Sequence, residues 1–225
     1  MLANFPVPRN QDDLGPAKNK RSRKSGNGPI RILHFLNQFF AGIGGEEKAN
    51  VPFEAKEGTM GPGNAIQQHL GKNAKIIATI FAGDNWFTEN PEIASSSLRA
   101  ALSKYDPDVV IAGPAFNAGR YGLACGQVCQ ISAEEGIPSV TAMFPENPGV
   151  LQYDTETYIL PTGTTPAETP GTFESIANFA LKLTSDEPLG PAETEGYLSR
   201  GIRRTGLRKH TASKRAVDMI VKRLS

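Results

Sequence analysis

The chain has 225 residues, which is enough for one α/β domain with a sizeable core. Its formal net charge is +1, so no overall positive field favours nucleic acid as a partner. Two cysteines do not make a disulfide framework. No apolar run approaches the ~18 residues of a membrane span, and the N-terminus lacks the apolar core of a secretory signal. We therefore expect a cytoplasmic protein that has no contact with a membrane.

Residues 1–29 are rich in Pro, Gly, Asn, Lys and Arg and have no periodic apolar pattern, which predicts a disordered basic tail. The basic cluster at residues 18–24 allows two interpretations, a nucleic-acid or targeting patch and a solvated tail, and we favour the second. After this tail we expect an α/β domain over residues 30–185 and an extension over residues 186–225.

Beyond residue 30, short apolar runs alternate with segments of helical pattern. Strands are predicted at residues 32–36, 75–81, 109–112, 139–144 and 158–160, and helices at residues 63–70, 91–105, 121–135 and 173–183. Continuous apolar strands that alternate with helices are typical of a parallel sheet buried on both faces. The sequence therefore predicts an α/β fold with a doubly wound, mainly parallel sheet of the flavodoxin-like, three-layer kind, followed by a C-terminal helical extension.

The extension ends in an apolar stripe at helical spacing, formed by Val217, Ile220, Val221 and Leu224. A single apolar stripe needs a surface to pack against, either on the domain itself or on another subunit. We expect the protein to act in an oligomer or a larger complex.

Polar side chains follow four successive predicted strands, at the edge of the sheet where α/β proteins bind ligands. These candidate ligand-binding residues are Asn37, Gln38, Asp84, Asn85, Trp86, Asn117, Arg120, Tyr121, Glu146 and Asn147. Amides and an arginine fork suit a carboxylate or an amino-acid-like ligand, with Arg120 as the cation that faces it. The alternatives are ordinary polar loops and a structural Arg120 that neutralises nearby acids.

The glycine-rich segment at residues 41–45 lacks the spacing of a dinucleotide-binding turn, and no P-loop Lys-Ser/Thr pair follows a glycine cluster. We therefore expect these glycines to permit a tight turn or a close backbone approach rather than to bind nucleotide. The charged residues that follow, Glu46, Glu47 and Lys48, are interpreted as a solvated face.

The two cysteines, Cys125 and Cys129, are four residues apart on a predicted helix and so point to one side of it. Near the helix N-terminus, the helix dipole and Arg120 would stabilise a thiolate, as a redox pair or a catalytic nucleophile requires. Two small buried residues packed against the sheet are an equally open alternative. No metal site is expected, because the three histidines lack ligand spacing.

Long ungapped motifs occur from residue 30 to the end of the chain. They are NQFFAGIGGEEK (37–48), GPG (61–63), AGPAFNAGRYG (112–122), ENPGV (146–150), EGY (195–197), RGIR (200–203) and SKRAVDM (213–219). These motifs resemble those of the selenoprotein subunit of component B of the glycine, sarcosine and betaine reductases. Subunits of D-proline reductase are more distantly similar.

The resemblance implies an oxidoreductase of anaerobic amino-acid metabolism that cleaves a C–N bond of a small amine with thiol- or thioredoxin-derived electrons. It also implies partners: a pyruvoyl-bearing component B subunit that holds the substrate amine, and the small selenoprotein component A. No cofactor is expected in this chain itself. The selenocysteine and the pyruvoyl group would belong to partner subunits or to sequence outside it.

In the family, the selenocysteine lies in a continuation beyond the equivalent of Leu224, so this chain would be a fragment or a short relative. Three hypotheses follow. We favour a reductase subunit that is not catalytic alone. The others are a non-catalytic small-ligand-binding or assembly subunit of the same fold, and a thiol enzyme that uses Cys125. The sequence does not distinguish glycine, sarcosine, betaine or another amine as the substrate, because a methyl group changes binding by only ~1–3 kcal/mol.

Overall fold

The computed structural model describes residues 28–201 and, further along the chain, residues 213, 214, 216, 217, 220 and 221. The chain divides into a larger unit that ends at Gly201 and a smaller one that contains the later residues. The basic cluster at residues 18–24 and Leu224 lie outside the described residues.

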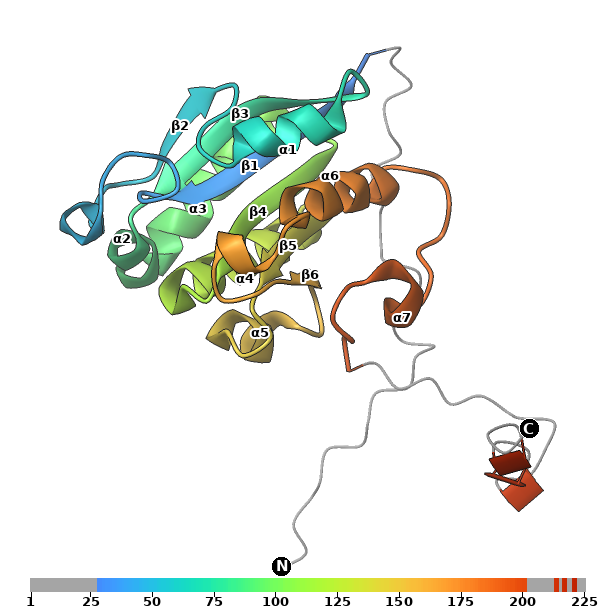
Figure 1. Cartoon of the computed structure of the whole chain (residues 1–225). Coiled ribbons are helices and arrows are strands. Elements are labelled where there is room, and N and C mark those ends of the chain that lie inside the picture. Colours follow the sequence, from blue (N-terminus) through green and yellow to red (C-terminus); the bar gives the residue numbers. More distant parts are fainter. Residues whose placement is uncertain (1–27, 202–212, 215, 218–219, 222–225) are drawn as a thin grey trace, which may run out of the picture. The chain divides into compact units, whose positions relative to one another are not determined.

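A six-stranded sheet forms the centre of the larger unit (Figure 1). Its strands are β1 (Ile30–Asn37), β2 (Glu54–Glu57), β3 (Ala74–Ala82), β4 (Val109–Phe116), β5 (Ser139–Met143) and β6 (Tyr158–Pro161), in the order β2-β3-β1-β4-β5-β6. All neighbouring strands are parallel except β2, which pairs antiparallel with β3. Because the five parallel strands follow the flavodoxin-like order, the predicted fold class is confirmed.

The edge strand β2 is the strand that the sequence did not predict. Its four residues are all exposed, and three of them are charged. It therefore lacks the apolar run that identified the buried strands. A short, charged edge strand also protects a sheet from pairing with other chains.

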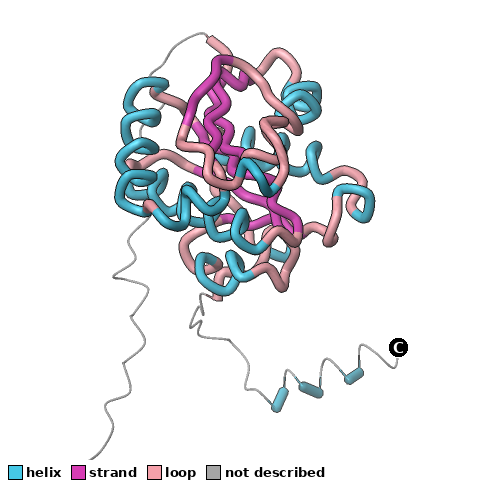
Figure 2. The backbone as a smooth tube through the Cα atoms, turned by 90° about the vertical axis from the view of Figure 1, so that its left-hand side faces the viewer, coloured by secondary structure: helices cyan, strands magenta, loops and turns pink. Residues whose placement is uncertain are grey.

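Helices cover both faces of the sheet (Figure 2). They are α1 (Gly63–Leu70), α2 (Asp84–Glu89), α3 (Pro91–Tyr105), α4 (Gly119–Glu134), α5 (Pro148–Tyr153), α6 (Thr172–Leu183) and α7 (Ala192–Glu195), with short 3-10 turns η2 (Glu46–Lys48) and η3 (Pro166–Glu168). Leu33 of β1 shares one core with Phe87 and Leu98 of α2 and α3, while its neighbour Ile32 shares the other core with Ile66 of α1. The two faces of β1 are thus buried in different layers.

The segment after residue 185 belongs to the larger unit. The Leu198 N–H donates to the carbonyl oxygen of Ile159 at 2.8 Å, and the Tyr197 ring contacts that of Tyr158 at a centroid distance of 5.1 Å. The larger unit runs on to Gly201. The division of the chain at residue 185 stays a prediction.

The predicted C-terminal helical stripe is only partly described. Val217, Ile220 and Val221 are helical and exposed. A partner surface for this stripe stays a prediction.

Helix α5 packs against α4 through glycines. A Cβ atom at Gly149 would lie 2.5 Å from the backbone oxygen of Gly122, and one at Gly126 would lie 2.1 Å from the Tyr153 ring. The two helices therefore approach closely enough to exclude a side chain between them. This contact also places Asn147, which precedes α5, beside the turn that follows β4.

Replacing Gly149 with Ala is expected to lower the free energy of unfolding by about 1–3 kcal/mol, because the added methyl group meets backbone rather than a mobile side chain. Urea unfolding would measure the change. Gly28→Ala is the matched control, since a Cβ there has no neighbour within 4 Å. Equal stability of the two variants would contradict the close contact.

Candidate functional site

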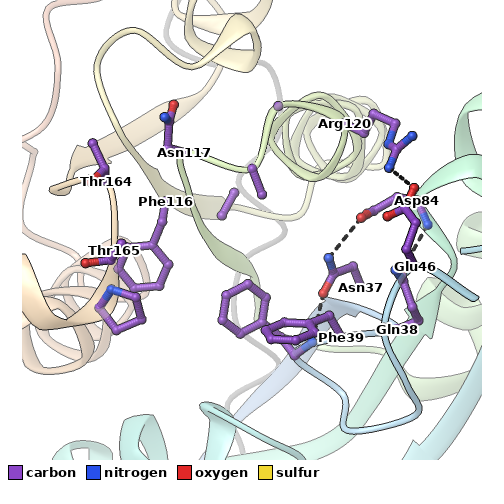
Figure 3. Close-up of a pocket in the computed structure, with 16 residues that line it drawn as sticks. Asn37, Gln38, Phe39, Glu46, Asp84, Phe116, Asn117, Arg120, Thr164 and Thr165 are labelled. Carbon is purple, nitrogen blue, oxygen red and sulfur yellow. Dashed lines mark hydrogen bonds and ion pairs between the residues drawn. The ribbon is translucent and has the colours of Figure 1, made fainter. Parts of the chain in front are cut away.

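A cavity of about 370 Å³ lies beyond the carboxyl ends of β1 and β4 (Figure 3). The strand order reverses between these two strands, and doubly wound sheets bind ligands at such a point. The cavity is lined by Asn37, Gln38, Phe39, Phe40, Gly45, Glu46, Asp84, Ala115, Phe116, Asn117, Ala118, Gly119, Arg120, Thr164, Thr165 and Pro166. These residues come from the segments that follow β1, β3, β4 and β6.

Asp84, the first residue of α2, is a carboxylate that is 8% exposed. Its Oδ2 accepts a hydrogen bond from Asn37 Nδ2 at 3.1 Å, and its backbone N–H donates to Gln38 Oε1 at 3.0 Å. Its Oδ1 has no hydrogen-bond partner within the described part of the chain. Burial raises the pKa of Asp84, although the bond from Asn37 and the charge of Arg120 oppose the shift.

Arg120, in the first turn of α4, forms an ion pair with Glu46 of η2 at the cavity (Figure 3). The side chains are 49% and 69% exposed, so water screens the pair and its net stabilisation is small. Glu46 is thus part of the site rather than of a purely solvated face. An anionic ligand that reached Arg120 would compete with Glu46 at little energetic cost.

Aromatic rings line part of the cavity. Phe39 is 63% exposed, and Phe40 packs between Tyr121 and Phe116 with ring centroids 5.6 and 6.1 Å away. Phe116 has φ = +47°, a left-handed conformation that is strained for a bulky residue. Strain of this kind is concentrated at functional sites.

Five of the candidate residues come together at the cavity: Asn37, Gln38, Asp84, Asn117 and Arg120. Asn117 is exposed, and its backbone N–H donates to the carbonyl oxygen of Thr164 at 3.3 Å, which joins the turns after β4 and β6. The positions of the strand ends therefore predicted that these five residues lie together; that they bind a ligand stays a prediction.

Two candidates have structural positions instead. Asn147 is fully buried, donates from Nδ2 to the carbonyl oxygens of Phe116 and Ala118, and accepts from the Gly149 N–H. Its amide is used within the protein. Tyr121 is also fully buried, in the core beneath Phe40.

The remaining candidates, Asn85, Trp86 and Glu146, do not line the cavity. The chain turns into α2 directly after Gly83, so only Asp84 of that strand end reaches the site. Glu146 is exposed on the turn before α5. Trp86 packs partly against the core, and the aromatic rings that line the cavity are those of Phe39, Phe40 and Phe116.

The sequence also did not single out Thr164 and Thr165, which line the cavity after β6. Thr164 donates from its N–H and its hydroxyl to Glu168 Oε2, at 2.8 and 2.7 Å. The only signal available was that this loop follows the fifth predicted strand.

Both cysteines of α4 are fully buried and line no part of the cavity. Burial raises the pKa of Cys125 well above its ordinary value and that of Cys129 to about 12. This is the opposite of the stabilised thiolate that the helix N-terminus and Arg120 suggested, because desolvation outweighs both effects. The thiols agree with the alternative of small residues packed against the sheet.

Fold and site together define a flavodoxin-like α/β protein with a small cavity, lined by polar and aromatic side chains, at its topological switch point. The model of the glycine/sarcosine/betaine reductase selenoprotein B family matches residues 29–225. The chain belongs to this family.

Several curated relatives are similar over most of the chain. It is 43% identical over 197 residues to sarcosine reductase complex component B subunit beta of Peptoclostridium acidaminophilum, which covers 87% of this chain and 45% of the relative. A glycine reductase complex component B subunit gamma of Carboxydothermus hydrogenoformans is 43% identical over 196 residues, with the same coverage. Betaine reductase complex component B subunit beta of P. acidaminophilum is 37% identical over 198 residues, again 87% of this chain and 45% of the relative.

The chain thus spans about half the length of these relatives, with 45% of each covered. No solved structure matches it. Within the described ranges, no helix has the length and apolar character needed to cross a bilayer.

Asp84→Asn is expected to raise the free energy of unfolding at neutral pH. The pKa of Asp84 in the folded protein lies above its ordinary 3.8, so the ionised group costs folding energy. The cost is absent below the ordinary pKa, grows as the pH rises toward the folded-state pKa, and then stays constant. An amide at this position still accepts from Asn37.

Chemical unfolding at about pH 3 and at pH 7 would test this, with Glu89→Gln, an exposed position on the same helix, as the matched control. The stability gain of Asp84→Asn over wild type should be small at the lower pH and larger at pH 7. Destabilisation at pH 7 would show that the carboxylate is structural.

Proposed function

We propose that this chain is a subunit of a glycine/sarcosine/betaine reductase-type complex, and that its cavity binds the small amine whose C–N bond the complex cleaves reductively. The observation that carries the proposal is the cavity itself. Its position at the switch point, its size and its lining by both an acid, Asp84, and a base, Arg120, suit a small ligand that bears both an ammonium and a carboxylate. The names of the relatives supply the class of substrate.

Arg120 is the group we assign to the ligand carboxylate. Its guanidinium lines the cavity and already holds the carboxylate of Glu46. A ligand carboxylate can take the place of Glu46, because the exchange replaces one ion pair with another. Asn117 lies on the same turn after β4 and can add an amide contact.

The covalent step needs groups beyond this chain. Cleavage of a C–N bond with release of an amine consumes two electrons, and both thiols of the sequence are buried away from the cavity. The selenocysteine and pyruvoyl group that the resemblance implies would therefore be supplied by the component B partner, by component A or by sequence outside this chain. The exposed side chains of Phe39, Glu46 and Arg120 border the cavity, so a group on another chain can reach it.

The buried thiols also favour a second candidate, a non-catalytic subunit that binds the ligand or assembles the complex. In this case the cavity would hold the ligand for a partner without a reaction at this chain. The thiol-enzyme hypothesis based on Cys125 has no support from the position of this residue.

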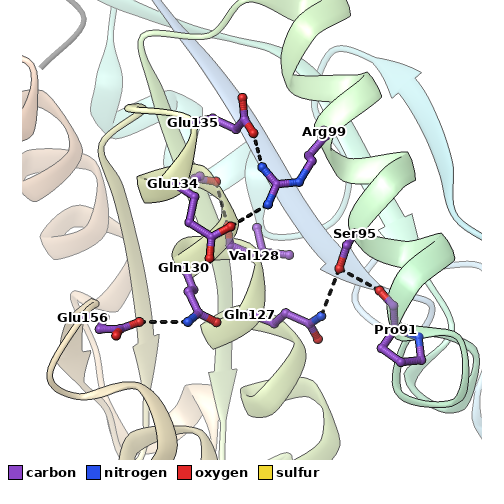
Figure 4. A network of polar contacts seen from close by, with 10 residues as sticks. Pro91, Ser95, Arg99, Gln127, Val128, Gln130, Glu134, Glu135 and Glu156 are labelled. Carbon is purple, nitrogen blue, oxygen red and sulfur yellow. Dashed lines mark hydrogen bonds and ion pairs between the residues drawn. The ribbon is translucent and has the colours of Figure 1, made fainter. Parts of the chain in front are cut away.

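Calorimetry with glycine, sarcosine and betaine would test the assignment of Arg120. We expect Arg120→Lys to weaken binding of all three by roughly tenfold, because a lysine keeps the charge but loses the bidentate fork. Arg99→Lys is the matched control, since Arg99 of α3 forms exposed ion pairs with Glu134 and Glu135 away from the cavity (Figure 4).

Unchanged affinity in Arg120→Lys together with a lowered melting temperature would make Arg120 structural. The three ligands should also be tested with the pyruvoyl-bearing partner present. If none of them bound under either condition, the proposed function would be contradicted.

The purified chain alone is expected to show no reductase activity, because its two thiols are buried and neutral. The assay follows release of ammonia or methylamine from glycine or sarcosine with a dithiol as reductant. Release of ammonia or methylamine that requires both the substrate and this chain would contradict the proposal that other subunits supply the reacting groups.

A further inference from the structure

The buried oxygen Oδ1 of Asp84 has no hydrogen-bond donor within the described part of the chain, although Asp84 lines the cavity. A buried acceptor without a donor is costly, and such groups in folded proteins usually have a partner. The role of Asp84 proposed below rests on the proposed function, since it concerns the ligand of the same cavity.

The rest of Asp84 is held in place. Asn37 donates to Oδ2, and Gln38 accepts from the backbone N–H, and both of these side chains are buried. Asn37 is itself anchored, because its Oδ1 accepts from the Phe40 N–H at 2.9 Å. Asn37 and Gln38 are therefore positioning residues, and Oδ1 is the carboxylate oxygen that has no donor in the described part of the chain.

The charges at the cavity favour a cation at this position. Its lining contains two acids, Asp84 and Glu46, and one base, Arg120. The ion pair between Arg120 and Glu46 neutralises one of the acids. In the described ranges Asp84 forms no ion pair, although the charge of Arg120 acts on it. A ligand that brings one positive charge with an N–H donor would satisfy both the charge and the hydrogen bond.

We propose that Oδ1 of Asp84 accepts a hydrogen bond from the ligand ammonium, so that this chain selects primary and secondary amines over quaternary ones. Glycine and sarcosine carry N–H donors at neutral pH, whereas the nitrogen of betaine carries three methyl groups and no donor. A quaternary ligand would cover Oδ1 with methyl groups and leave it without a partner. Sites built to hydrogen-bond a substrate discriminate strongly against analogues that lack the group.

The test measures binding of four ligands to the wild-type chain in complex with its component B partner: glycine, sarcosine, betaine and acetate. Acetate keeps the carboxylate and lacks the nitrogen. We expect glycine and sarcosine to bind at least ~10-fold more tightly than betaine or acetate, the range of a hydrogen bond to a charged group. Betaine binding as tight as glycine would overturn the inference without any variant.

Asp84→Asn is expected to weaken the binding of glycine and of sarcosine at least ~10-fold. Acetate should bind with equal or higher affinity, so that the preference for ligands with N–H donors is lost. Glu89→Gln removes one exposed negative charge from the same helix and should leave all four affinities unchanged. Thermal melts of each variant show whether it is still folded. If Asp84 were merely structural, Asp84→Asn would weaken the binding of acetate as well as that of glycine and sarcosine.

The outcomes distinguish this inference from the proposed function. If wild type bound none of the four ligands, both would fail. If it bound glycine and Asp84→Asn kept the same preference over betaine, the role of Asp84 would be wrong while the proposed function stood.

Discussion

The constraint on which this structure depends is the position of β1 in the middle of a buried parallel sheet. Both faces of β1 are covered by helices, and both edges pair with neighbouring strands. The segment that leaves the carboxyl end of β1 leads to the β3 side of the sheet, whereas the segment that leaves the carboxyl end of β4 leads to the β5 side. The two turns separate there, and the gap between them is the cavity.

The cavity is lined by groups that lower the stability of the folded protein. Asp84 is a buried carboxylate whose pKa is raised by desolvation, and Phe116 has a left-handed backbone conformation. Neighbouring structure holds each of them in place, with Asn37 on the carboxylate and Asn147 on the carbonyl oxygen of Phe116. Such a combination of locally unfavourable groups and dedicated supports is typical of a binding site rather than of a core.

The buried thiols and the exposed side chains at the cavity differ in their chemical properties. The thiols lie inside the core, where desolvation keeps them protonated, and so they are poor nucleophiles. The groups at the cavity mouth are exposed and bear charge or an aromatic ring. Under the proposed function, such a chain would bind and orient a ligand, and another subunit would provide the reacting atoms.

The sequence by itself determined the fold class and which polar side chains stand at one edge of the sheet; that they bind a ligand stays a prediction. Buried parallel strands are continuous apolar runs, and their carboxyl ends meet at one edge, so Asn37, Asp84 and Arg120 were found by counting strand ends. Only the tertiary structure decided what each side chain does there. Asn147 looked like a ligand-binding amide until its contacts with Phe116 and Gly149 were seen, and the cysteines looked activated until their burial was known. Hydrogen-bond partners and desolvation depend on contacts between segments that are distant in the chain, so a local sequence pattern does not predict them.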